Sequence, residues 1–123
     1  MARRQDVVEF LNLFKSATML GYLHVRDREK NMQALVDLGV TPSERKELIL
    51  GLTPEDYMAG PKPDDTDPEK EVWEFGANVQ GVEVYIKLRL ARDPRKRNVY
   101  HATVWSFHPA EFPMRYPLRG GGE

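Results

Sequence analysis

The stretch Gly81-Val-Glu-Val-Tyr-Ile-Lys-Leu-Arg-Leu90 has the most regular pattern in this chain of 123 residues. Apolar residues recur at every second position, and this two-residue period predicts a half-buried β-strand with one side on a core. The apolar side comprises Val82, Val84, Ile86, Leu88 and Leu90, and the other side comprises Glu83, Tyr85, Lys87 and Arg89. The second side is either a solvated sheet surface or a binding surface.

Two further strands are predicted next to this one, over residues 72–76 and residues 99–108. Turn residues separate the three segments, which indicates an antiparallel meander. The register between the strands decides which side chains share a face, and the sequence leaves that register open.

Helices are predicted ahead of these strands. Apolar residues at helical spacing indicate one helix over residues 4–20 and a short extended piece over residues 22–26. Asp27 is the expected N-cap of a second helix that reaches about residue 38. Its expected inward side chains are Met32, Leu35 and Val36.

Start and stop signals are clearest for a third helix. Thr41-Pro42-Ser43-Glu44 is a capping box with proline at the first helical position, and Gly51 is placed to end the helix. Residues 53–56 repeat the start signal for a single turn. Residues 60–68 are rich in proline and aspartate and are expected to form a loop, without the glycine spacing of a calcium loop.

Helices followed by strands predict an α+β fold, with N-terminal helices packed on a three- or four-stranded antiparallel sheet. The length fits one domain, over residues 1–119, with a flexible tail at 120–123 after a proline-rich segment. The chain has no cysteine, which excludes disulfides and thiolate chemistry and is compatible with a reducing cytoplasm. It also has no pattern of a membrane span or signal peptide, so we expect a soluble, cytoplasmic protein.

Charge is segregated along the chain although the formal net charge is −1. Residues 53–74 hold 8 acids and 2 bases, a balance of −6, whereas residues 86–119 hold 8 bases and 2 acids, a balance of +6. This polarity either favours an anionic partner for the second half or reflects two surfaces that pair with each other.

The three strands carry side chains that could form one patch: Trp73, Glu74, Tyr85, Lys87, Ser106 and His108. Cleavage of RNA without a metal requires a base for the ribose 2′-OH, an acid for the leaving 5′-oxygen and cations for the phosphate. Histidine suits one of these proton transfers near neutral pH. Each residue also has a structural interpretation, since Trp73 and Trp105 fit a core, Tyr85 fits an ordinary strand position, and His108 fits a strand end.

Four segments together resemble the toxins of the MqsR family, the motility quorum-sensing regulator group within the RelE-like ribonucleases. They are Leu50-Gly-Leu-Thr-Pro-Glu-Asp-Tyr57, Val72-Trp-Glu74, Gly81-Val-Glu-Val-Tyr-Ile-Lys-Leu88 and Trp105-Ser-Phe-His108. The resemblance covers roughly residues 22 to 110. It implies a RelE-like α+β fold, a sequence-selective endoribonuclease that cleaves mRNA without a metal or other cofactor, and a cognate antitoxin protein as partner.

Tyr85 and Lys87 match the tyrosine-x-lysine strand of that family, whereas three other positions depart from it. Glu74 stands where the family has glutamine, and His108 stands where it has lysine. The family also has a lysine just after the Asp-aromatic turn, where this chain has Met58-Ala59-Gly60 and offers Lys62 only a few residues later. These departures imply either a different acid and base set or a relative that has lost activity.

The resemblance implies that Tyr85 positions the 2′-OH or the phosphate, that His108 is acid or base, and that Glu74 is a possible base. The residues expected to take part in catalysis are Tyr85, His108, Glu74 and Lys87, and those expected to bind substrate are Lys62, Arg89, Trp73 and Arg97. The alternative is a non-catalytic module that binds RNA or a protein through the basic sheet face.

Overall fold

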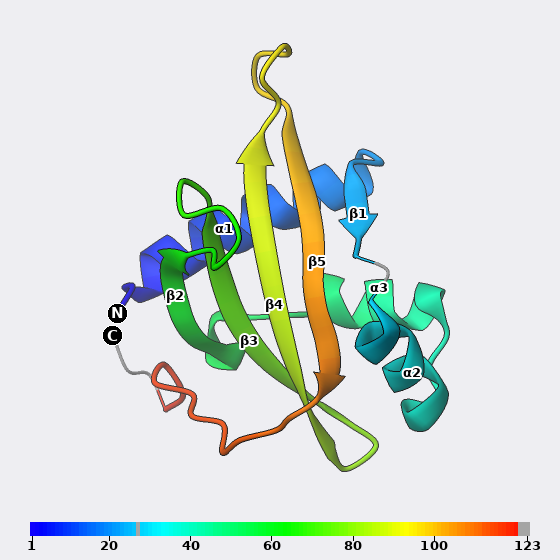
Figure 1. Ribbon diagram of the computed structural model, residues 1–123. Helices are drawn as coiled ribbons and strands as arrows, with labels where there is room; N and C mark the ends of the chain where they lie inside the picture. The colour runs from blue at the N-terminus through cyan, green and yellow to red at the C-terminus, as the bar shows by residue number, and fades with distance from the viewer. Residues whose placement is uncertain (27, 121–123) are drawn as a thin grey trace.

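The computed structural model describes residues 1–26 and 28–120 (Figure 1). In chain order the elements are α1 (Arg4–Met19), β1 (Leu23–Val25), α2 (Glu29–Leu38), α3 (Pro42–Leu50), the 3₁₀ turn η1 (Pro54–Asp56), β2 (Tyr57–Pro63), β3 (Glu71–Val79), β4 (Val82–Arg92) and β5 (Tyr100–Pro109). The α+β class is therefore confirmed. None of the helices in this described part is both long and apolar enough to cross a membrane.

The strands form one mixed sheet in the order β1-β5-β4-β3-β2. Strand β1 runs parallel to β5, and the other neighbours are antiparallel. The expected sheet of three or four antiparallel strands was thus wrong in strand number and in the direction of one edge. Helix α1 precedes β1 in the chain, and β1 lies beside β5 at one edge of the sheet (Figure 1).

The loop expected over residues 60–68 was wrong for its first part, because β2 continues to Pro63. Strand β2 contains Pro61 and Pro63 and lies at the edge of the sheet. An edge strand tolerates proline because one of its sides has no ladder partner that would need an N–H donor.

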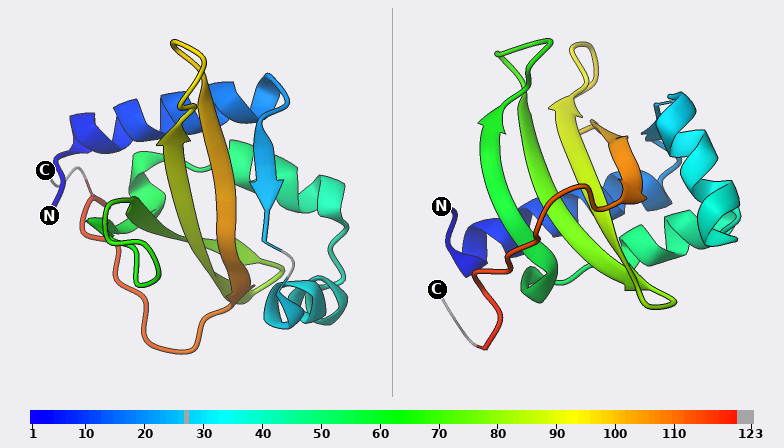
Figure 2. Two further views of the ribbon diagram at one scale, coloured as in Figure 1. Left: turned by 45° about the horizontal axis from the view of Figure 1, so that its top comes forward. Right: turned by 60° about the horizontal axis from the view of Figure 1, so that its bottom comes forward.

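The core lies between the sheet and the helices. Helices α1 and α3 lie on one side of the sheet (Figure 2). The alternation in β4 faces Val84, Ile86 and Leu88 towards them, and all three are fully buried, as predicted. Val82 at the hairpin end is 40% exposed, so the pattern holds only where helices cover the strand. We call the opposite side of the sheet, where β4 presents Tyr85, the open face.

Helix α2 buries a side that matches the prediction only at Leu35, which is partly buried against the core. Met32 is 56% exposed and Val36 is 75% exposed, whereas the buried residues are Asn31, Ala34 and Leu38. Arg28 is the N-cap residue, and the expected cap Asp27 lies outside the described residues. The hydrophobic pattern was misleading because the innermost position of the helix belongs to a polar side chain.

Asn31 is buried because its amide completes the backbone hydrogen bonding of β5. Its Nδ2 donates to the carbonyl oxygens of Arg26 and Trp105, both at 3.1 Å, and its Oδ1 accepts from the N–H of Phe107 at 3.0 Å. These contacts lie beside a register shift in the β4–β5 pairing, where Trp105 is the extra residue of a β-bulge. The side chain thus supplies the partners that a longer β1 would have supplied.

The boundary signals of the other helices are confirmed. Thr41 and Glu44 form the reciprocal capping box at the start of α3, with N···O distances of 3.1 and 3.0 Å. Gly51 is the C-cap of that helix, and the next start signal yields only the short turn η1.

The segment after β5 contains no helix or strand between residues 110 and 120, as its prolines predict. It runs back along the end of the sheet towards the N-terminus (Figure 1). Leu118 is fully buried, and its carbonyl accepts from Arg4 of α1 at 2.9 Å. The segment is therefore anchored up to this point, and residues 121–123 of the expected tail lie outside the described residues.

A polar cluster on the open face as candidate active site

The strand register brings most of the predicted site residues together on the open face. Tyr85 of β4 pairs with His108 of β5, and Lys87 pairs with Glu74 of β3 on one side and with Ser106 of β5 on the other. Side chains that are paired across neighbouring strands lie about 5 Å apart at their Cβ atoms. Residues far apart in the sequence thus form one continuous polar cluster.

Tyr85, Glu74 and Lys62 form a connected chain within this cluster. The Tyr85 hydroxyl donates a short hydrogen bond to one carboxylate oxygen of Glu74, and the other oxygen lies 2.7 Å from Nζ of Lys62. Burial, and next the bonded Glu74 carboxylate, raise the pKa of Tyr85 far above its ordinary value. The phenol therefore stays protonated at neutral pH and acts as a donor, not as a base.

His108 is held in a defined orientation next to this chain. Its Nδ1 lies 2.9 Å from the carbonyl oxygen of Pro109, and its ring centroid lies 5.4 Å from that of Tyr85. A carbonyl oxygen only accepts, so Nδ1 carries the hydrogen, and the neutral ring keeps its lone pair on Nε2. Among the described residues Nε2 has no hydrogen-bond partner. The imidazole is therefore arranged as a proton acceptor.

Phe112 is part of this site although sequence reasoning did not find it. Its ring meets the edge of Tyr85 at a centroid distance of 5.4 Å, with an interplanar angle of 65°. It lies in the irregular segment after β5, where no periodic pattern relates a residue to the sheet. Only the return path of the chain over the open face places it there.

Arg89, one of the expected phosphate ligands, is already engaged. Its Nη1 donates to Asp64 at 2.8 Å, and Asp64 is 1% exposed. Burial raises the pKa of Asp64, but hydrogen bonds from Thr66 and Arg89 outweigh this effect and hold the pKa below its ordinary value. The ion pair anchors the acidic segment after β2 to the open face, so Arg89 holds a carboxylate of its own chain.

Lys87 has no ion pair within the described part of the chain, although it lies between Glu74 and Ser106 in the register. Its side chain is half-buried on the open face. Lys87 is thus the cation of the cluster that is available for an external anion, whereas Lys62 is paired with Glu74.

Trp105 lies on the open face, and its expected core position was wrong. It is half-buried, and the guanidinium carbons of Arg26 and Arg89 lie 4.0 and 4.5 Å from its ring centroid. The β-bulge explains this orientation, because the extra residue shifts the alternation of β5 at that point. Cations over an indole ring are favourable, so Arg26, Arg89 and Trp105 form one stacked group on the open face.

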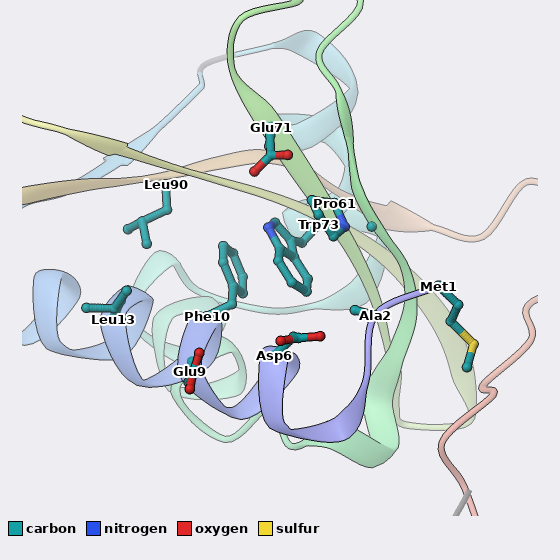
Figure 3. Close-up of a pocket in the computed structure, with 11 residues that line it drawn as sticks. Met1, Ala2, Asp6, Glu9, Phe10, Leu13, Pro61, Glu71, Trp73 and Leu90 are labelled. Carbon is teal, nitrogen blue, oxygen red and sulfur yellow. The ribbon is translucent and has the colours of Figure 1, made fainter. Parts of the chain in front are cut away.

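Two expected substrate ligands lie away from the cluster. Trp73 is on the side of the helices and stacks on Phe10 of α1 (Figure 3), with a centroid distance of 4.5 Å and an interplanar angle of 13°. Arg97 lies in the turn between β4 and β5, at the top of Figure 1. Tyr85 is about 23 Å from Arg92, where that turn begins, at the usual rise of a strand. Trp73 and Arg97 therefore do not belong to the polar cluster.

No cluster of three or more histidine, aspartate or glutamate side chains suited to a metal ion occurs among the residues that the structure describes. No protein-family model matches the sequence, and no curated protein matches it either.

Proposed function

We propose that this protein is an endoribonuclease that cleaves mRNA without a metal, as the toxin of a type II toxin–antitoxin pair. The observation that carries the proposal is the oriented imidazole of His108, with a free Nε2, in ring contact with Tyr85. The α+β fold is in keeping with the family resemblance, which supplies mRNA as substrate and an antitoxin as partner. A reading frame for a small antitoxin-like protein beside this gene would support the second half of the proposal.

In the proposed reaction His108 is the base. Its Nε2 takes the proton of the ribose 2′-OH while the 2′-oxygen forms a bond to the adjacent phosphorus. The bond from phosphorus to the 5′-oxygen breaks, and that oxygen takes a proton from the ammonium group of Lys87. The products are a 2′,3′-cyclic phosphate and a 5′-hydroxyl, so atoms and charges balance.

The other members of the cluster would position the RNA. The protonated phenol of Tyr85 offers a donor for a phosphate oxygen once RNA competes with Glu74 for it. Lys62 neutralises Glu74, which lowers the repulsion between that carboxylate and the phosphate. The guanidinium group of Arg26, which lies over the ring of Trp105, offers a planar cation on which an unpaired base can stack.

A non-catalytic RNA-binding module is the second candidate function. The ion pairs of Glu74 with Lys62 and of Arg89 with Asp64 favour it, because three of the expected catalytic and phosphate-binding groups are already occupied. In that case RNA would bind through Lys87 and the guanidinium group of Arg26 over Trp105 without being cleaved.

The deciding experiment incubates purified protein with mRNA, with and without translating ribosomes, and maps the RNA ends. We expect His108→Ala to lower cleavage by about 10²–10⁴-fold, the usual loss when a general base is removed. Tyr85→Phe should also impair it, and His24→Ala, at a surface histidine elsewhere on the sheet, should not. Cleavage should persist in EDTA.

Folded wild-type protein that is inert under both conditions would favour the binding module. Cleavage that stops with chelator, or that is unchanged in the His108 and Tyr85 variants, would contradict the mechanism.

A further inference from the structure

A pair of histidines lies at the edge of the open face, where β1 pairs with β5. His24 of β1 pairs with Thr103, which pairs in turn with Arg89 on the open face. His101 is two residues before Thr103 and therefore lies on the same side of β5. It is also seven residues before His108, which is about 23 Å at the usual rise of a strand. The pair is thus separate from the polar cluster.

The ring of His101 is oriented by Asp93, in the turn between β4 and β5. Its Nε2 lies 2.7 Å from Oδ2 of Asp93, and a carboxylate only accepts, so Nε2 carries the hydrogen. Asp93 is fixed in its turn by the N–H groups of Arg95 and Lys96, at 2.8 and 2.9 Å. The neutral ring therefore keeps its lone pair on Nδ1, which lies 3.0 Å from Nε2 of His24.

His24 can direct a second lone pair at the same point. Its side chain is exposed, and its Nδ1 has no hydrogen-bond partner among the described residues. The hydrogen that lies between the two rings can therefore move to Nδ1 of His24, and only the bond between the rings is lost. In that tautomer Nε2 of His24 and Nδ1 of His101 are two nitrogen ligands that face each other.

The distance between the two nitrogens fits a shared metal ion. Zn–N bonds measure about 2.0–2.1 Å, so two nitrogens on one ion at an angle of about 90–109° lie about 2.9–3.4 Å apart. The observed separation of 3.0 Å falls within this range. The ion would lie to one side of the line between the nitrogens, and the exposed ring of His24 can turn towards it without disturbing the core.

The contact of His101 with Asp93 is a second feature of metal sites. A histidine that binds a metal usually donates its other ring N–H to a carboxylate, which fixes the tautomer and makes the ligating nitrogen more basic. The charge of Asp93 also favours a cation nearby. The bases of the same turn, Arg95 and Lys96, are exposed, so solvent screens their repulsion of the ion.

We propose that His24 and His101 bind one divalent transition-metal ion of the kind that prefers imidazole, with Zn²⁺ as the probe. Nε2 of His24 and Nδ1 of His101 are the ligands, Asp93 orients His101, and water fills the other positions. The ion joins β1, which is only three residues long, to β5. This site does not depend on the proposed RNA cleavage.

The test is calorimetric titration of the full chain, without a histidine tag, with Zn²⁺ and with Mg²⁺ as a cation that prefers oxygen ligands. We expect one saturable Zn²⁺ site per chain and no binding of Mg²⁺. His24→Ala should abolish the binding of Zn²⁺. Asp93→Asn should weaken it about tenfold, the lower end of the usual 10–100-fold loss, because the amide oxygen still accepts from His101 but the charge is gone. His108→Ala, at the third histidine of the chain, should leave the affinity unchanged.

Thermal unfolding gives an independent measurement. Zn²⁺ should raise the Tm of the wild type and not that of His24→Ala, because only the folded pairing of β1 with β5 brings the two ligands together. The exposed position of His24 allows this variant to fold. Several results would overturn the proposal: no saturable binding, an equal response to Mg²⁺, Zn²⁺ binding that persists in His24→Ala, unchanged affinity in Asp93→Asn, or a loss confined to His108→Ala, which would place the ion at the polar cluster.

Discussion

The side chain of Tyr116 lies directly over Gly76, in the space that any other residue at position 76 would need. A Cβ added to Gly76 would lie 2.8 Å from Cε1 of Tyr116 and even closer to its hydroxyl. The same hydroxyl donates to Glu83 at 3.0 Å, and burial together with this bond raises the pKa of Tyr116 to about 12. Because Gly76 pairs with Tyr85 in the sheet, this contact holds the C-terminal segment beside the polar cluster.

Gly76→Ala should destabilise the protein by about 1–3 kcal/mol, the usual cost of overpacking. The double variant Gly76→Ala/Tyr116→Ala should lose less free energy of unfolding than the two single variants together, because removing the ring relieves the clash. Urea denaturation measures all three. Additive losses would mean that the two residues do not share this space.

Ile86→Ala should lower the free energy of unfolding by about 2–5 kcal/mol, since the side chain is fully buried at the centre of β4. Val82→Ala is the matched control in the same strand, where the side chain is partly exposed, and it should change the stability by only about 0.5 kcal/mol. A loss for Ile86→Ala as small as that of the control would mean that the strand faces are misassigned.

Asn31→Asp should be strongly destabilising although the shape is conserved. The acid keeps the acceptor for Phe107 but loses the donors to Arg26 and Trp105. The Arg26 carbonyl still accepts from the N–H of Arg28, so the main cost is about 1–3 kcal/mol for the lost donor to the Trp105 carbonyl. A favourable interaction of the new charge with the start of α2 offsets only about 0.3–1 kcal/mol. Asn12→Asp, at an exposed position of α1, is the control. Equal urea midpoints for the two variants would contradict the role of the amide.

Asp93 should make stability depend on pH in the acid range. A hydrogen bond from His101 at 2.7 Å, and next those from the N–H groups of Arg95 and Lys96, lower its pKa to about 2 from 3.8. The lowered pKa means that this contribution is fully present above about pH 4 and is lost as the pH falls through about 2. The difference in Tm between wild type and Asp93→Asn should therefore shrink over that range.

Asp37→Asn changes an exposed acid of α2 and is the control for this titration. A difference between wild type and Asp93→Asn that stays constant from about pH 5 to about pH 2.5 would show that the carboxylate is not stabilised in its charged form.

RNA affinity should fall as salt rises if the open face contacts phosphates. With His108→Ala to prevent cleavage, fluorescence anisotropy should give a linear fall of log K with log salt, and Lys87→Ala should reduce the slope by about 0.7, the value for one phosphate on a single strand. Lys46→Ala, on the exposed side of α3, should not change the slope. Binding that is flat between low and physiological salt would argue against a nucleic-acid role for this face.

Local patterns predicted the fold where the signal and its cause lie in the same segment. The alternation in β4 and the capping box of α3 are of this kind, because neighbouring residues determine both. Helix α2 was misread because Asn31 is buried by backbone groups of β5 that lie far away in the sequence. Hydrophobic periodicity depends only on residues within the helix, so it cannot predict that a polar side chain is buried by hydrogen bonds to a distant strand.

The candidate site was predictable only in its composition. Strand order and register bring Tyr85, Glu74 and His108 together on one face, an arrangement that the sequence left open. The β-bulge that places Trp105 on the open face has no signal in the sequence. The pairing of Arg89 with Asp64 joins residues 25 positions apart. Arg89 was predicted to bind phosphate, but in the structure its guanidinium group binds Asp64. Only the tertiary structure identifies this ion pair.

The side chain of Asn31 also determines how this protein can associate with others. Strand β5 would present free backbone donors and acceptors below the short β1, and the amide of Asn31 occupies them. At the other edge, Pro61 and Pro63 remove two donors from β2. At these positions the described sheet has no free backbone groups for strand addition, which lowers the risk of edge-to-edge aggregation. A protein partner that bound here would have to contact side chains, because these backbone groups cannot pair with an added strand.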